Sequence, residues 1–266
     1  MDVREFLFAP LQGKTYKFSI KSRENGIFSG AARLKDMAAE LGIAQFRVRP
    51  EGQELHAGSL VFSGMGNAET VTKAEEILPG VIGKPSGVAT AAAAFTQKTQ
   101  RLKVVCGAWK KVDRAVRKEL RQAVITGGAE LRITDEPFIY LDKNYIRMFG
   151  GIAVAVARAK AFDASRVVVA QLRGESMDIA SEANLAVRAG AGILMVDTGQ
   201  VSDLRLVVAA AEQGGWRERV RLAFAGGVNV QQLEELANLG ADIVDVGRAI
   251  LDAPMLDFCL DVEGEL

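Results

Sequence analysis

Residues 222–229 read Leu-Ala-Phe-Ala-Gly-Gly-Val-Asn, and residues 243–248 read Ile-Val-Asp-Val-Gly-Arg. Each stretch is a short apolar run that leads into glycine, and each precedes a segment in which a helix is expected. A buried strand that leads through a short link into a helix is the repeating unit of parallel α/β folds. These two stretches therefore predict two consecutive strand–helix units near the C-terminus.

The same pattern reaches back to about residue 100. Further apolar strands are expected over 102–106, 130–133, 138–141, 166–172 and 192–197, with helices over 152–161, 179–189, 204–213 and 230–239. A (β/α) barrel is favoured over an open doubly wound sheet, because the links are short and no Gly-x-Gly-x-x-Gly follows the first strand. Seven strands are counted rather than eight, so counting alone leaves the closure of the barrel open.

The first part of the chain has a different pattern of polar and apolar residues. Residues 14–21 alternate polar and apolar side chains, residues 31–41 have helical spacing, and residues 45–49 alternate again. This pattern is typical of an α/β module whose antiparallel sheet has one face in water. We therefore predict an N-terminal α/β sandwich domain over residues 1–98 and a barrel domain over residues 99–254.

Composition excludes several classes of function. Lys plus Arg and Asp plus Glu both number 33, so the balanced charge predicts neither a nucleic-acid partner nor an anionic membrane partner. No run of 18 apolar residues and no signal-peptide pattern is found, and Cys106 and Cys259 have neither metal-binding nor redox spacing. A cytoplasmic protein is expected. The single histidine, His56, argues against a histidine base or a multi-histidine metal site.

The two glycine-ended strands predict a phosphate-binding corner. In barrels the last two strand–helix loops often hold a phosphate through backbone N–H groups, which glycine lets approach closely. Gly226, Gly227 and Gly247 are the candidates, and Arg248 would add a charged donor. The alternative is that these are ordinary turns. The preferred ligand is a phosphorylated sugar or a nucleotide.

Asp197 ends the apolar run Ile-Leu-Met-Val-Asp. A carboxylate at the carboxyl end of a barrel strand points toward the mouth, where ribose hydroxyls or Mg²⁺ would be its ligands. The alternative is that Asp197 or Thr198 caps the next helix.

Together these motifs resemble the quinolinate phosphoribosyltransferase family. The similar segments occur in the family's order and at its spacing: residues 22–30, Ser86–Thr90 (a helix start in the family), Gly127–Arg132, Asp142–Ile146, Gly150–Val156, Asp197, Gly226–Gly227, Val246–Ile250 and Leu256–Val262. The resemblance implies an α/β sandwich, completed by residues of about 255–266, beside an open (β/α) barrel. It also implies a homodimer, Mg²⁺, and phosphoribosyl transfer from 5-phosphoribosyl diphosphate to a pyridine dicarboxylate with loss of carbon dioxide.

The chain departs from that family where the family holds its dianionic acceptor. Glu76, Trp109 and Asp142 stand in place of two arginines and a lysine, and Leu131 and Tyr145 replace two histidines. Lys110 and Arg132 remain, and Lys143 lies one residue beyond the family's lysine, on what is expected to be a strand end facing away. Gln171 takes the place of a ribose-binding glutamate.

These changes predict an altered acceptor. Glu76 and Asp142 would shift the pocket by about four charge units, which disfavours a dicarboxylate and suits a neutral or cationic ring. Lys110, Arg132 and Lys143 would meet the diphosphate or the acceptor, and Trp109 is equally a stacking platform or core filler. A non-catalytic nucleotide-binding relative with a regulatory or assembly role, and an authentic quinolinate phosphoribosyltransferase, are the alternatives.

Overall fold

The computed structural model describes residues 3–266, which form two compact units. The first contains the residues up to Ala94 together with Lys110–Gly128 and Ile250–Leu266, and the second contains Phe95–Trp109 and Ala129–Ala249. The division expected from the sequence placed residues 110–128 in the barrel. In the structure α4 (Arg114–Thr126) belongs to the first unit, where the following Gly127 packs so closely on α3 (Ala68–Lys98) that a Cβ would lie 2.3 Å from the carbonyl oxygen of Ala89.

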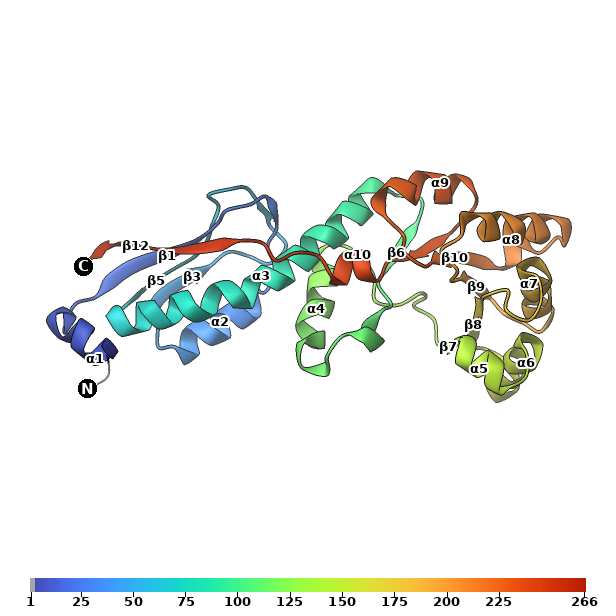
Figure 1. Ribbon diagram of the computed structural model, residues 1–266, viewed down its shortest axis with the longest axis horizontal. Coiled ribbons are helices and arrows are strands. Elements are labelled where there is room, and N and C mark those ends of the chain that lie inside the picture. The colour runs from blue at the N-terminus through green and yellow to red at the C-terminus, as the bar shows by residue number, and fades with distance from the viewer. Residues whose placement is uncertain (1–2) are drawn as a thin grey trace. The chain divides into compact units, whose positions relative to one another are not determined.

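An antiparallel sheet of order β12-β1-β5-β3 forms the first unit's sandwich. Its strands are β1 (Tyr16–Ser22), β3 (Ala44–Val48), β5 (Leu60–Gly66) and β12 (Phe258–Glu265). Figure 1 shows β12 beside β1, and the register runs from Tyr16 opposite Glu265 to Ser22 opposite Phe258. The C-terminal segment therefore completes the N-terminal sheet.

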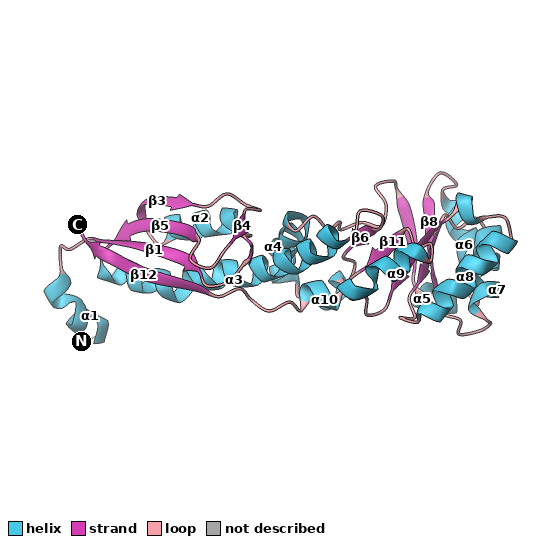
Figure 2. Ribbon diagram, turned by 90° about the horizontal axis from the view of Figure 1, so that it is seen from above, coloured by secondary structure: helices cyan, strands magenta, loops and turns pink. Residues whose placement is uncertain are grey.

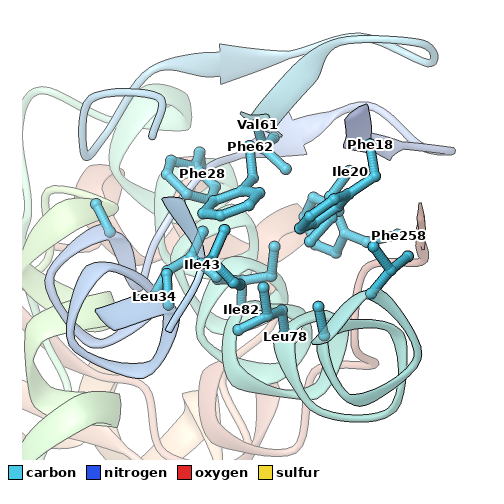
Figure 3. Packing of buried hydrophobic residues seen from close by; sticks show 14 of the residues in the cluster. Phe18, Ile20, Phe28, Leu34, Ile43, Val61, Phe62, Leu78, Ile82 and Phe258 are labelled. Carbon is cyan, nitrogen blue, oxygen red and sulfur yellow. The ribbon is translucent and has the colours of Figure 1, made fainter. Parts of the chain in front are cut away.

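Helices α2 (Ala31–Glu40) and α3 cover one face of this sheet (Figure 2). The buried interface contains Phe18, Phe62 and Phe258 from the strands, and Leu34 and Leu78 from the helices (Figure 3). Alternating strand side chains and helical spacing thus meet in one apolar layer. Short elements complete the unit: α1 (Val3–Phe8), η1 (Ala9–Leu11), β2 (Gly26–Ile27), β4 (Glu54–Leu55) and α10 (Arg248–Leu251), which extends into it from the second unit.

The segment Ser86–Thr90 does not start a helix. It lies inside α3, a 31-residue helix that contains Pro79 and Pro85. The helix start at Ser86 was implied by the family resemblance, whereas here the helix continues although proline removes a backbone donor. In the folded unit the Ser86 hydroxyl instead exchanges hydrogen bonds with the backbone of Ser29, and Thr90 accepts one from the N–H of Ile27.

The second unit contains a six-stranded parallel sheet of order β6-β11-β10-β9-β8-β7 (Figure 1). Its strands are β6 (Lys103–Val105), β7 (Phe138–Leu141), β8 (Val167–Leu172), β9 (Ile193–Val196), β10 (Arg221–Ala225) and β11 (Ile243–Asp245). Its helices are η2 (Trp109–Lys111, shared with the first unit), α5 (Lys143–Met148), α6 (Ile152–Phe162), α7 (Ile179–Arg188), α8 (Val201–Gln213), η3 (Arg217–Arg219), η4 (Val230–Gln232) and α9 (Leu233–Asn238). The predicted α/β fold class is confirmed.

The sheet is a half-barrel rather than a closed barrel in the described residues. The strand expected over residues 130–133 forms only one bridge, between Glu130 and Val105. Ile133 turns instead into the apolar interior, and β6 and β7 remain the two edges of the sheet. The half-barrel interior is filled by alternate strand residues, namely Val105, Val169, Ile193, Met195, Ala223, Ala225 and Ile243.

No helix among residues 3–266 is both long and apolar enough to cross a bilayer.

Candidate functional site

The carboxyl ends of the half-barrel strands carry a group of polar side chains on the inner face. Two residues beyond the interior positions of Phe138, Val169, Met195 and Ile243 stand Tyr140, Gln171, Asp197 and Asp245. Successive strand residues point to opposite faces, so a step of two residues keeps the side chain on the inner face. We call Tyr140, Gln171, Asp197 and Asp245 the inner ring.

Tyr140 feels the charges of the neighbouring acids. Its pKa is raised first by burial and then by the charges of Asp245, Asp197 and Asp142. Strands β7 and β11 are separated in the sheet by three others, so the charge of Asp245 acts on Tyr140 across the sheet rather than from a neighbouring strand. Both changes oppose ionisation of the phenol, which therefore stays neutral and available as a hydrogen-bond donor.

Asp245 is the most deeply placed acid of the ring. One oxygen accepts a hydrogen bond from the backbone N–H of Gly107 at 2.8 Å. The pKa of Asp245 is raised to about 6, mainly by burial; the Gly107 hydrogen bond opposes the rise and the charge of Asp197 adds to it. The sequence analysis missed both Asp245 and Tyr140. The signal was the alternation of Ile243, Val244 and Asp245, which puts the carboxylate on the same face as the buried Ile243.

Gln171 links two other parts of the site. Its amide nitrogen donates to the Asp197 carboxylate, and its amide oxygen accepts the backbone N–H of Lys143 at 2.6 Å. Gln171 is buried, and both ends of its amide are thus engaged within the protein. This arrangement gives Gln171 a positioning role toward Asp197, whereas the sequence suggested direct contact with the substrate.

Asp197 is not a helix cap in this structure. The next helix, α8, begins after Gln200 without a side-chain cap. Asp197 is instead held by Gln171 and by Arg173, whose guanidinium donates to the Asp197 carbonyl at 2.6 Å and lies 3.9 Å from its carboxylate. The carboxylate remains partly exposed, with 31% of the side chain accessible, so it can meet a ligand.

The glycine corner contains one pair of backbones in close contact. Gly199 and Gly226 have φ values of +72° and +106°, and a Cβ on Gly199 would lie 2.3 Å from the carbonyl oxygen of Gly226. Gly227 is different, because it has a φ of +93° and open space where a Cβ would stand. Asn229 then forms a capping box with Gln232. Gly226 is thus required by packing, and Gly227 leaves a bare backbone at the surface.

The other two predicted members of the corner are Gly247 and Arg248. A Cβ on Gly247 would lie 2.8 Å from the Cβ of Ala108, so packing against the β6 end favours glycine there. Arg248 is exposed and begins α10. Both follow β11 directly, at the same edge of the sheet as Gly226 and Gly227.

Asp142 and Lys143 stand where β7 gives way to α5. The Asp142 carboxylate caps α5 by accepting the N–H groups of Asn144 and Tyr145 at 2.9 and 3.3 Å. Lys143 is the first residue of α5 rather than the end of a strand, so the strand argument that turned it away from the site was wrong. Lys143 lines a cleft together with Gln171.

Four predicted residues lie elsewhere. Trp109 is 7% exposed, which favours the core-filler interpretation. The Arg132 guanidinium lies over the ring of Phe138 and donates to the carbonyls of Thr134 and Glu136, at the amino end of β7, opposite the end that carries the inner ring. Lys110 and Glu76 belong to the first unit, where Glu76 is half-exposed on α3 and pairs with Arg4.

The antiparallel sandwich and the parallel half-barrel with polar strand ends define a two-part α/β fold whose candidate site lies at the carboxyl ends of the half-barrel strands. Comparison with known proteins makes the assignment specific, because the sequence model described as quinolinate phosphoribosyl transferase, C-terminal domain, matches residues 88–261. The chain therefore belongs to the quinolinate phosphoribosyl transferase family.

Relatives match over almost the whole chain. A protein of Methanothermobacter thermautotrophicus named probable nicotinate-nucleotide pyrophosphorylase [carboxylating] is 26% identical over 248 residues, covering 92% of this chain and 88% of its own. One of the same name from Archaeoglobus fulgidus is 25% identical over 91% of this chain and 93% of its own. The crystal structure of nicotinate-nucleotide pyrophosphorylase from Pyrococcus furiosus superposes with a TM-score of 0.84 at 18% identity, covering 98% of this chain and 73% of that one, which supports the fold.

Proposed function

We propose that this protein transfers phosphoribosyl from 5-phosphoribosyl diphosphate to an aromatic or heterocyclic acceptor other than quinolinate. Family membership supports phosphoribosyl transfer, and the inner ring supports the changed acceptor. The four side chains of the ring comprise two carboxylates, one amide and one phenol. A dianionic acceptor placed among them would meet two carboxylates of like charge, which disfavours its binding. A neutral or cationic ring would instead find hydrogen-bond acceptors.

Residues of the half-barrel supply the remaining roles. Asp197, held by Gln171 and Arg173, is the candidate for the ribose hydroxyls. Gly227 and Arg248 are the candidates for the 5-phosphate, because backbone N–H groups and a guanidinium both suit that anion. Such a site favours an oxocarbenium-like state by electrostatics, so catalysis would not need a histidine.

Mg²⁺ fits this site only together with substrate. Within residues 3–266 no three His, Cys, Asp or Glu side chains are placed to hold a metal ion. Mg²⁺ often binds through one or two carboxylates plus substrate phosphates, and Asp197 is the carboxylate available for that role. When bound, the ion would neutralise charge on the departing diphosphate.

The test is calorimetric titration of the purified protein with 5-phosphoribosyl diphosphate plus Mg²⁺ and, separately, with quinolinate and nicotinamide. Binding of the first compound, lost in Asp197→Asn and kept in the exposed-surface control Asp36→Asn, is the expected result. Turnover of quinolinate would show that the acceptor assignment is wrong and that the relatives' printed activity applies here. If 5-phosphoribosyl diphosphate does not bind, the transferase proposal fails, and the alternative of a non-catalytic role takes its place.

Two further expectations belong with this proposal. We infer a homodimer, which light scattering at micromolar concentration would test, and a monomer there would contradict it. We also propose a cytoplasmic location, as the composition of the chain suggests.

A further inference from the structure

A cleft lies beside the inner ring, at the carboxyl ends of β7 and β8. Its walls include the start of α5, the link between α5 and α6, and the loop from β8 to α7. Three cationic side chains line it: Lys143, Arg147 and Arg173. Gln171 is shared between this cleft and the inner ring.

The cleft already holds one carboxylate between its two guanidinium groups. Arg147 donates to one oxygen of Glu175 through two nitrogens, at 2.6 and 2.9 Å, and the Arg173 guanidinium lies 3.5 Å from the other oxygen. The Arg147 hydrogen bond is the main cause of the lowered pKa of Glu175, and the charges of Arg147, Arg173 and Lys143 add to it. Three cations and two carboxylates, Glu175 and Glu182, therefore line the cleft, and Glu175 is the one that contacts the guanidinium groups of both arginines.

Glu175 sits in this position on an exposed loop. Its side chain is 39% accessible and that of Arg147 is 56% accessible, so the ion pair is screened by water and weak. The remaining acid, Glu182, is buried and accepts the backbone N–H groups of Arg173 and Gly174 at 2.9 and 2.8 Å. Glu182 therefore shapes the base of the loop, and Glu175 is the carboxylate that an incoming anion would have to displace.

The start of α6 also favours a negatively charged ligand in the cleft. Helix α6 has 11 residues and begins after Gly151, which offers no side-chain cap. Gly150 and Gly151 line the cleft with φ values of +74° and +151° and open space where a Cβ would stand. The uncapped first turn adds a partial positive charge to that of the three side chains.

We propose that this cleft binds a compact oxyanion, a carboxylate or phosphate group, on Lys143, Arg147 and Arg173 in competition with Glu175. The site is separate from the glycine corner. Arg173 also holds the Asp197 carbonyl, so an anion in the cleft is adjacent to the residue proposed for the ribose. Two sources share this chemistry, namely the diphosphate end of the phosphoribosyl donor and an acid group on the acceptor. Anion binding itself does not require the transfer reaction.

Calorimetric titration at fixed ionic strength tests the site, with inorganic diphosphate, inorganic phosphate and nicotinate as separate probes. Removing the competing carboxylate in Glu175→Gln is expected to tighten binding by about fivefold, the effect of one exposed ion pair. Arg147→Gln and Lys143→Gln are each expected to weaken it by a similar factor. Arg188→Gln, an exposed arginine of α7, is the matched control. Tighter binding of diphosphate identifies the donor as the source, whereas tighter binding of nicotinate would identify an acid group on the acceptor and contradict the neutral or cationic ring proposed above.

The outcomes separate this inference from the proposed function. Unchanged affinity in both Glu175→Gln and Arg147→Gln overturns the cleft, even if 5-phosphoribosyl diphosphate binds through the glycine corner. Conversely, inorganic diphosphate binding that depends on Arg147, with no binding of 5-phosphoribosyl diphosphate, keeps the cleft and removes the transferase proposal. If Glu175→Gln does not fold, Arg147→Gln and Lys143→Gln decide the matter.

Discussion

The backbone N–H of Gly107 donates to the Asp245 carboxylate at 2.8 Å and so fixes a buried acid where β11 meets β6. The approach is close enough that a Cβ on Gly107 would lie 2.5 Å from the other carboxylate oxygen. Only glycine allows this contact at position 107. The inner ring thus contains a rigidly held carboxylate whose ionisation is opposed by its surroundings.

This contact makes stability depend on pH. The pKa of Asp245 is about 6 in the folded protein, against 3.8 ordinarily, so between these values the folded state binds the proton more tightly than the unfolded state does. Stability attributable to this group is therefore greatest below about pH 4 and is lost as the pH rises to about 6. Asp245→Asn, which removes the charge, is expected to be more stable than the parent at pH 7.5 by on the order of 2–3 kcal/mol.

Urea unfolding of both proteins at pH 4 and pH 7.5 measures this difference. The two should differ little at pH 4, which lies well below the folded pKa and close to the ordinary value of 3.8, so that ionisation contributes little to the difference there. A variant that is less stable than the parent at pH 7.5 would show that the ionised carboxylate is stabilised by a partner. The exposed Asp36→Asn serves as the control and should shift neither curve.

The second prediction concerns Gln171. Gln171→Glu keeps an oxygen for the Lys143 N–H but replaces the donor to Asp197 with a second carboxylate. Like charges in contact destabilise each other, so the free energy of unfolding should fall by about 1–2 kcal/mol at pH 8 and by less at pH 4.5. Thermal unfolding at the two pH values provides the measurement. Gln122→Glu on the exposed face of α4 is the control, and an equal loss at both pH values would contradict the charge argument.

The third prediction separates the glycines of the corner. Gly226→Ala forces a Cβ to within 2.4 Å of the Gly199 nitrogen and should cost at least about 2 kcal/mol of stability. Gly227→Ala meets no neighbour and should cost only about 1–2 kcal/mol, from its left-handed backbone. The affinity for 5-phosphoribosyl diphosphate should nevertheless fall in Gly227→Ala. Unchanged affinity in a folded Gly227→Ala would remove Gly227 from the phosphate site.

The fourth prediction concerns a helix cap in the sandwich. Helix α2 starts after Gly30, which has no capping side chain, and Glu51 supplies the acceptor instead. Its carboxylate accepts the N–H groups of Gly30 and Ala31 at 3.0 and 2.9 Å, and the hydroxyls of Ser29 and Thr126 at 2.6 and 2.8 Å. Glu51→Ala should lower the free energy of unfolding by about 1–2 kcal/mol, as the loss of a cap does. The exposed Glu54→Gln is the control in a denaturant titration, and equal midpoints for the two variants would rule out the cap.

Several elements were predictable from local patterns alone. The strands at 138–141 and 221–225 occur at the predicted bounds, and the helices beginning at Ile152 and Ile179 start where their apolar spacing begins. These elements depend on periodicity within about ten residues, which sequence records directly. The strand at 130–133 failed because an apolar run does not reveal whether a partner strand lies beside it, and here Ile133 packs into the interior instead.

The candidate site was only partly accessible to sequence. Asp197 and the glycine corner follow from their place after predicted strands. Gln171 was expected to touch substrate, but its amide is used by Asp197 and Lys143, which are 26 and 28 residues away in the chain. Arg132 was expected at the site, yet its contacts place it at the other end of β7. No local sequence pattern predicts these contacts of Gln171 and Arg132.

The sequence by itself determined most of the strands and helices and the resemblance to the family, because periodicity and motif order are properties of the chain, and the phosphate corner stays a prediction. Only the tertiary structure decided which side chains share a site. The charge of Asp245 raises the pKa of Tyr140 although the two residues lie on strands separated by three others, and Arg147 and Arg173, from α5 and the loop after β8, both approach Glu175. The physical reason is that charge, burial and hydrogen bonding act over a few ångströms in space, whatever the separation along the chain.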